Sequence, residues 1–226
     1  SHLWERGSKT LYNRWRDGER DSVQLLDAYA NLLGGVLELY QATLNPDHLQ
    51  FAFDLATSML DRFYDSEHGG FWQSGANAKD LILRLKDDYD GAEPSGNSVA
   101  TLALLKLGAI TDNTRFKEAS AKTLQLFTER MQQLPQAVPL MMHALDYYLE
   151  EPRRVVIVGE PEEPLLSAAH SVYQPHKVIL SNRGPVELFA RTLPKSEETT
   201  AYVCTGTACK PPTTKPEEVL KFLREK

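Results

Sequence analysis

Four carboxylates crowd into seven residues of this chain, between positions 87 and 93. They are Asp87, Asp88, Asp90 and Glu93, with Tyr89 among them. Two glycines and a proline in the surrounding stretch Arg84–Asn97 predict a turn-rich loop and not a helix. Crowded carboxyls push their pKa values apart, and glycoside hydrolysis needs one protonated and one ionised carboxyl. Asp88 and Glu93 are therefore the expected catalytic pair, with Asp90 as a third candidate.

Residues around these acids would bind the ligand of such an enzyme. Aromatic faces can stack on sugar rings, and polar side chains can bond to hydroxyl groups. Three loops, Arg14–Asp27, His68–Asn97 and Gln132–Pro139, are expected to gather at one mouth of the fold. The expected binding residues are Arg14, Asp17, Asp27, Trp72, Arg84, Tyr89 and Asn97.

A structural interpretation of the same stretch is open as well. Ser95 or Asn97 could cap the helix that follows, and Asp90-Gly91 is a turn signal. Basic side chains of the loop could neutralise its acids. The spacing of the carboxylates is not that of an EF-hand calcium loop. We expect no metal ion and no other cofactor.

The segments that flank the loop predict helices of two kinds. Three helices are apolar on most faces, which indicates that other elements enclose them: Ser22–Leu44, Ser98–Leu107 and Pro139–Leu149. Two helices with one apolar face alternate with them. The first is capped by Asn45 and ends near Tyr64, and the second is capped by Asp112 or Thr114 and ends near Met131. This order predicts a mainly α protein, part of an (α/α)6 toroid of inner and outer helical hairpins.

Shorter features complete the helical part, taken as residues 1–151. Leu11–Arg20 is interpreted as a loop. His68–Gln73 predicts a turn and a short extended piece, and Leu81–Leu85 a strand that pairs back. On the first helix, Asp27, Asn31 and Glu38 form a polar strip. That strip either faces a wet cavity or is hydrogen-bonded internally.

The pattern changes after Pro152, and residues 152–226 predict a small α/β module. Val155–Gly159 and Lys177–Ser181 are expected strands, with a helix at Pro164–Tyr173 between them in a βαβ unit. Tyr202–Cys204 predicts a third strand and Pro216–Glu225 a closing helix. No glycine-rich phosphate-binding motif follows the first strand. We expect this module to have a packing role.

Charge, hydropathy and cysteine content indicate which partners and which compartment to expect. The net charge is −6 without a Lys/Arg cluster, which argues against nucleic acid as a partner. No apolar run approaches the ~20 residues of a membrane span. No signal peptide is visible, which favours a soluble, cytoplasmic protein over a secreted one. For Cys204 and Cys209 we favour separate structural thiols over a local disulfide, and a disulfide over a metal site.

The run Arg84–Ala100 resembles the signature of thioredoxin-domain-containing proteins related to spermatogenesis-associated protein 20. Further stretches agree in order, so the resemblance covers essentially the whole chain. They are Arg16–Gly18, Gly69–Phe71, Pro139–Met141, Ala144–Asp146, Val155–Gly159, Tyr202–Cys204 and Ala208-Cys209.

This resemblance implies the C-terminal part of a larger protein. In that family a thioredoxin-like domain precedes a six-hairpin toroid similar to sugar epimerases and glycoside hydrolases. The missing half of the toroid and the thioredoxin-like domain would be its partners, in the same chain or as another chain. A small sugar would be the ligand of a hydrolase or epimerase. The alternative is a non-catalytic scaffold, because fold does not fix function.

Overall fold

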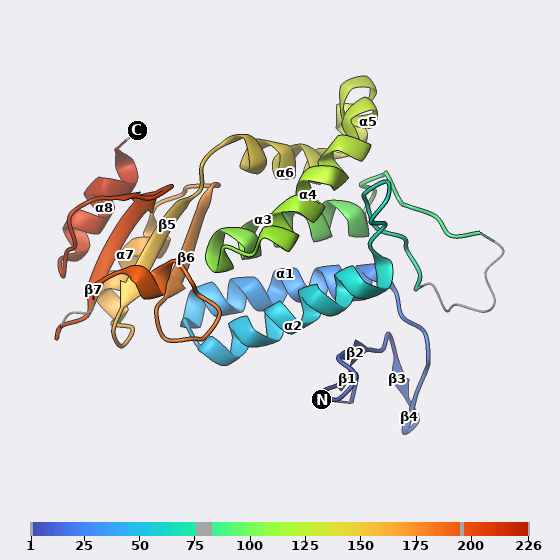
Figure 1. The fold of residues 1–226 in the computed structure, drawn as a ribbon, viewed down its shortest axis with the longest axis horizontal. Coiled ribbons are helices and arrows are strands. Elements are labelled where there is room, and N and C mark those ends of the chain that lie inside the picture. Colours follow the sequence, from blue (N-terminus) through green and yellow to red (C-terminus); the bar gives the residue numbers. More distant parts are fainter. Residues whose placement is uncertain (1, 76–82, 195–196, 226) are drawn as a thin grey trace.

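The computed structural model of the chain describes residues 2–75, 83–194 and 197–225. These residues form eight α-helices, which make up about half of the chain, and a small sheet module (Figure 1). The helices are α1 (Leu26–Thr43), α2 (Pro46–Phe63), α3 (Gly96–Thr111), α4 (Thr114–Leu126), α5 (Thr128–Gln133), α6 (Pro139–Leu149), α7 (Glu163–Ser171) and α8 (Pro216–Arg224). The strands are β1 (Trp4–Glu5), β2 (Thr10–Leu11), β3 (Trp15–Arg16), β4 (Glu19–Arg20), β5 (Arg153–Val158), β6 (Lys177–Ser181), β7 (Thr200–Thr205) and β8 (Ala208–Cys209).

The first helices alternate between two rows. α3 packs against α1 on one side and α6 on the other, so these three form one row. α2 packs against α1, and α4 packs against α3, as a second row (Figure 1). The alternation expected from the sequence is confirmed. Closure of these rows into a toroid stays a prediction. Among the described residues, no helix is long and apolar enough to cross a bilayer.

Side-chain caps define where three of these helices begin. Asn45 Oδ1 accepts the Asp47 N–H before α2, as expected, with Pro46 in the first turn. Ser95 caps α3 by accepting the Ser98 N–H. The expectation for α4 is wrong, because its cap is Asn113 and neither Asp112 nor Thr114. Asp112 has a left-handed φ of 56° and ends α3, so the next residue is the one placed to cap.

Because of tertiary contacts, α1 begins later in the chain than its sequence predicts. The predicted helix began at Ser22, but α1 begins at Leu26. The Leu26 N–H donates to Gln73 O at 3.0 Å, and Leu25 forms an isolated bridge with Ser74. These bonds to the turn after α2 hold Leu25 in an extended conformation, and residues 22–24 are not helical, although their local sequence permits a helix.

Two further expectations for irregular segments need correction. Leu11–Arg20 is not a plain loop, because β3 and β4 form a hairpin there. Its turn residues Asp17 and Gly18 both have positive φ, as two-residue hairpin turns require. The expected strand Leu81–Leu85 is absent over residues 83–85, and residues 81–82 lie outside the described part. The extended piece after Gly69-Gly70 is confirmed by a bridge between Phe71 and Tyr64.

The sheet follows the predicted order, with one addition. Its strand order is β6-β5-β7-β8. β5 and β6 are parallel and joined through α7, which confirms the βαβ unit, and β7 runs antiparallel to β5. The added strand β8 pairs Cys209 with Cys204, and the two cysteines form a disulfide. The preference for separate thiols is therefore wrong. Gly206, with a φ of 57°, permits the tight reversal between them.

Polar side chains at the end of α1 join the helices to the sheet. The Tyr40 hydroxyl donates to Glu187 Oε1 at 2.9 Å and accepts the Ser181 N–H at 3.0 Å. Gln41 Oε1 accepts the Ile179 N–H at 3.1 Å. Burial, and then the charge of Glu187, raise the pKa of Tyr40 well above its ordinary value, so its hydroxyl stays a donor. One apolar core continues through the helical part and the sheet.

This junction predicts a stability effect of one hydroxyl group. Tyr40→Phe leaves the buried Ser181 N–H without a partner and removes the shorter of two hydrogen bonds to Glu187 Oε1, so it should lower the free energy of unfolding by about 1–3 kcal/mol. Tyr173→Phe is the matched control, because Tyr173 is 91% exposed. Urea unfolding of both variants measures the difference. Equal stability of the two variants would contradict the bonding described here.

Candidate functional site

Asn97 fastens the acidic loop to the start of α3. Its side chain is fully buried. Asn97 Oδ1 accepts the Phe71 N–H at 2.7 Å, and Nδ2 donates to Phe71 O at 3.0 Å and to Asp87 O at 3.1 Å. One amide therefore joins the turn after α2, the acidic loop and α3. Because these hydrogen bonds already use the amide oxygen and nitrogen, the structure does not favour the ligand contact expected of Asn97.

Asp90, a catalytic candidate from the sequence, is also occupied by backbone groups. Its side chain is buried. Oδ1 accepts the Ser95 N–H at 2.9 Å, and Oδ2 accepts the N–H groups of Leu140 and Met141 in the first turn of α6. A carboxylate at a helix N-terminus satisfies free donors and the helix dipole. The geometry favours a structural role for Asp90.

Ion pairs hold the two ends of the loop. Lys86 Nζ lies 2.8 Å from Asp65 Oδ2 and also donates to Gly69 O. The Lys86 hydrogen bond, aided by the His68 and Glu67 N–H groups, holds the pKa of Asp65 well below its usual range. Asp88 pairs with Arg130 at 3.3 Å and is half exposed. The Asp88 side chain thus points toward Arg130 in α5.

Asp27, at the start of α1, interacts electrostatically with Asp87 and Glu93 of the acidic loop and accepts a hydrogen bond at the N-terminus of α3. Partial burial raises the pKa of the Asp27 carboxyl most, and the charges of Asp87 and Glu93 raise it further. The Gly96 backbone N–H opposes this by donating to Asp27. A Cβ at Gly96 would collide with Asp27 Oδ1 and the Leu26 side chain, so a residue without a side chain is needed there.

We call Asp27, Asp87 and Glu93 the carboxyl cluster. Asp27 and Glu93 were among the expected site residues, and Asp87 was not. A signal was present, because successive residues of an extended segment point to opposite sides. Asp87 and Asp88 therefore cannot both face Asp27. The polar strip on α1 is exposed, with Asn31 bonded to Asp27 O and Glu38 paired with Lys106.

The expected ligand-binding residues Trp72, Arg84 and Tyr89 differ in how open they are to a ligand. Arg84 donates to Ser74 O at 2.7 Å, and both Arg84 and Lys86 lie against the Trp72 ring, at 5.0 and 4.6 Å from its centre. These cations cover ring surface that a sugar would need. Tyr89 in contrast is 56% exposed. Tyr89 is therefore the aromatic side chain of the loop that is most open to a ligand.

Arg14 and Asp17 lie in or beside the β3–β4 hairpin. Asp17 pairs with Arg16 at 3.2 Å, and Arg14 pairs with Asp21 at 3.5 Å. The hairpin projects from the side of α1 opposite to α3 (Figure 1). Both side chains are thus held in ion pairs with residues close by in the sequence. Within the described ranges, no group of three or more His, Cys, Asp or Glu side chains could hold a metal ion.

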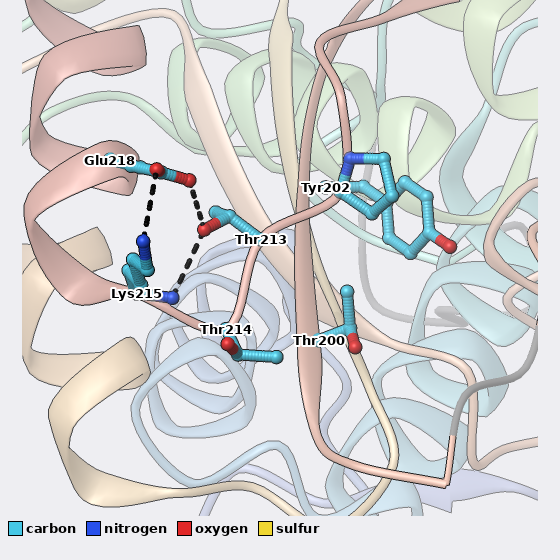
Figure 2. A pocket seen from close by; sticks show the side chains of 7 residues that line it. Thr200, Tyr202, Thr213, Thr214, Lys215 and Glu218 are labelled. Carbon is cyan, nitrogen blue, oxygen red and sulfur yellow. Dashed lines mark hydrogen bonds and ion pairs between the residues drawn. The ribbon is translucent and has the colours of Figure 1, made fainter.

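A separate pocket of about 330 Å³ lies beside the sheet (Figure 2). Its lining residues are Thr200, Tyr202, Pro212, Thr213, Thr214, Lys215 and Glu218. Thr213 Oγ1 donates to Glu218 and accepts the Lys215 N–H. The polar groups at its floor thus satisfy one another. The sheet lies at the opposite end of the molecule from the acidic loop (Figure 1), and no sequence pattern predicted this pocket.

The role of Asp90 predicts a contrast between neighbouring acids. Asp90→Ala leaves three backbone N–H groups without their acceptor and should cost about 2–4 kcal/mol of stability. Asp88→Ala removes one half-exposed ion pair and should cost less than about 1 kcal/mol. Denaturant unfolding of the two variants, followed by circular dichroism, tests the contrast. A small effect of Asp90→Ala would return that residue to the candidates for chemistry.

Comparison with known proteins shows similarity to one group. No protein-family model matches the chain. The chain is 37% identical to spermatogenesis-associated protein 20 of Rattus norvegicus over 213 residues, which are 88% of this chain and 27% of that protein. The protein of the same name from Homo sapiens is 37% identical over 211 residues, with the same coverage. An uncharacterised protein of Caenorhabditis elegans is 27% identical over 207 residues, 86% of this chain and 28% of that protein.

The resemblance seen in the sequence is thus confirmed as similarity to part of spermatogenesis-associated protein 20. The chain spans 27% of the length of the curated mammalian relatives that it matches. It is accordingly similar to one section of a larger protein.

Proposed function

We propose that this chain provides one wall of a carbohydrate-binding site, in which the carboxyl cluster holds or modifies a sugar. The raised pKa of Asp27 beside Asp87 and Glu93 carries the proposal. A carboxyl whose pKa is raised beside other carboxyls is an arrangement that glycoside hydrolysis uses. Asp27 lies at the start of α1 and the other two in the acidic loop, so the cluster joins two segments that are distant in sequence.

The roles within the cluster follow from the environment of each acid. Asp27, with its raised pKa, would protonate the leaving oxygen of a glycoside as the general acid. Glu93 is exposed and would act as the nucleophile or as the base for a water. Asp27 replaces Asp88 in the pair inferred from the sequence, because Arg130 already pairs with Asp88. Tyr89 offers an exposed ring for a sugar face.

The rest of such a site would come from protein beyond this section. Leu39 of α1 and Tyr148 and Leu149 of α6 are large apolar side chains that are exposed in the described structure. We propose that the remaining helices of a toroid cover this row, as the lengths of the relatives permit. A thioredoxin-like domain, in the same chain or as another chain, stays a proposed partner.

A non-catalytic scaffold is the second candidate. Asp90 and Asn97 favour it, because both are buried and occupied by backbone groups of neighbouring segments. In that case the acidic loop is a structural connection between α3 and α6. The carboxyl cluster would then be a surface feature without turnover.

Conservative amide substitutions separate the two candidates. Asp27→Asn and Glu93→Gln should each lower turnover of a sugar substrate by at least about 100-fold, because each removes one proton donor or acceptor. Asp88→Asn is the matched control and should keep near-normal turnover. A panel of aryl glycosides and reducing sugars, assayed with the full-length protein, provides the measurement. No turnover by the unsubstituted protein, and an empty glycan array, would support the scaffold.

The pH dependence of stability tests the cluster without a substrate. A raised pKa means that the folded state binds the Asp27 proton more tightly than the unfolded state. The contribution of this group to stability is full below about pH 4, the pKa of Asp in the unfolded chain. It is lost as pH rises through the pKa of Asp27 in the folded state. Asp27→Asn should therefore raise the melting temperature at pH 7 by about 1–3 °C, and the gain should vanish below about pH 4. A loss of stability at pH 7 would contradict the electrostatic account of the cluster.

A further inference from the structure

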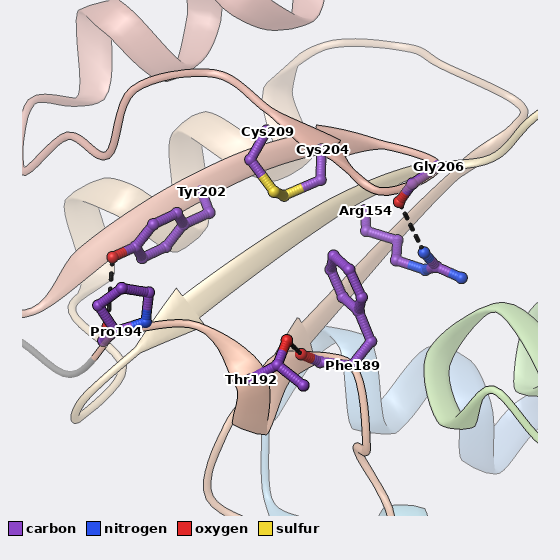
Figure 3. Close-up of a disulfide and its surroundings, with 8 residues drawn as sticks. All are labelled: Arg154, Phe189, Thr192, Pro194, Tyr202, Cys204, Gly206 and Cys209. Atoms are coloured by element: carbon purple, nitrogen blue, oxygen red, sulfur yellow. Dashed lines mark hydrogen bonds between the residues drawn. A yellow bond between two sulfur atoms is a disulfide. The ribbon is translucent and has the colours of Figure 1, made fainter.

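The Cys204–Cys209 disulfide connects one buried and one exposed cysteine. Cys204 lies in β7 with no exposed surface, whereas Cys209 lies in the two-residue edge strand β8 and is exposed. The two are directly opposite in the β7–β8 register (Figure 3). An external thiol can therefore approach Cys209 but not Cys204. Thiol–disulfide exchange depends on which sulfur is open to attack and on how well the other one leaves.

We propose that Cys204–Cys209 is an exchangeable disulfide of the native protein, attacked at Cys209 by a small thiol. The attacking thiolate forms a new S–S bond with Cys209 Sγ, and the old bond breaks with its electron pair on Cys204 Sγ. A second thiolate then attacks the sulfur of the small thiol in the mixed disulfide. Cys209 is freed, and the two small thiols leave joined as one disulfide. In total, two thiols are oxidised, the protein disulfide is reduced, and the two thiol protons end on the cysteines.

Arg154 is the cation that we expect to assist the departure of Cys204. Arg154 is opposite Cys204 in the β5–β7 register, so both side chains project from the same face of the sheet. The guanidinium donates to Ala109 O at 2.7 Å and to Gly206 O at 3.0 Å, and pairs with Asp112 at 2.9 Å. These bonds hold a positive charge at the tip of the β7–β8 hairpin that carries both cysteines (Figure 3). A nearby cation stabilises a thiolate.

The fold does not depend on the disulfide, so exchange can occur without unfolding. β7 pairs with β5 along its whole length, from Thr200 to Thr205. After β8, the Lys210 N–H donates to Val203 O, and Thr213 exchanges two backbone hydrogen bonds with Ala201. The chain between the cysteines is short, and a short loop restricts the unfolded state less than a long one. Reduction should therefore free the hairpin tip while the sheet persists.

Exchange can be measured on the full chain in buffers of reduced and oxidised glutathione, with acid quenching and peptide mapping by mass spectrometry. Reversible reduction, with glutathione attached to Cys209 and circular dichroism unchanged, is the expected result. Two outcomes would overturn the proposal. One is reduction only after denaturant is added, and the other is glutathione attached to Cys204.

A pair of single-thiol variants tests the part played by Arg154. Cys204 in Cys209→Ser should form its thiolate at lower pH than Cys209 in Cys204→Ser, as followed by thiolate absorbance. Arg154→Gln should slow release of Cys204 about tenfold, and Arg154→Lys, which keeps the charge, should restore most of the rate. If Arg154→Gln does not fold, the comparison of the two single-thiol variants still shows which cysteine forms its thiolate at lower pH. Thiolate formation by Cys204 at the same or higher pH than Cys209 would exclude leaving-group assistance.

Discussion

The hydrogen bonds of the Asn97 side chain hold the loops of the helical part in place. Asn97 pairs with both backbone groups of Phe71 and with the carbonyl of Asp87, from a fully buried position in the first turn of α3. A buried amide of this kind is stable only when all its partners are present. The turn after α2, the acidic loop and α3 therefore have to assemble together. The position of the carboxyl cluster follows from that assembly, since Asp87 is part of the bonded segment.

Local sequence signals predicted most helices and the strands β5, β6 and β7, and tertiary contacts explain several of the misses. Asn45 and the following proline marked the start of α2, because a cap is a short-range interaction. The start of α1 depends instead on the bond between Leu26 and Gln73, 47 residues later, which no local pattern reveals. At α4, three successive residues could each cap. The left-handed conformation of Asp112 decided among them, and that conformation depends on where α3 ends.

The candidate site was predictable in its location but not in its pairing. The density of acids marked the loop, and the loop does contribute two carboxyls of the cluster. Which acids meet Asp27 depends on the direction of each side chain, and hydrogen bonds to Asn97 and Arg130 set those directions. The disulfide was missed because two cysteines in 226 residues do not form a disulfide scaffold, which favoured separate thiols. A glycine between two β-prone segments, with cysteines at equal distance from the turn, is a hairpin signal that would have revealed it.

The bonds between Tyr40, Gln41 and the sheet have a consequence for synthesis. Their partners Ile179, Ser181 and Glu187 follow 138 to 147 residues later in the chain. At about 5–20 residues per second, the end of α1 leaves the ribosome on the order of ten seconds before these partners exist. During that interval its polar groups must be hydrated or shielded. The helical part thus cannot complete its native contacts until the sheet is translated, so a nascent chain that stalls before residue 177 would be a target for chaperones.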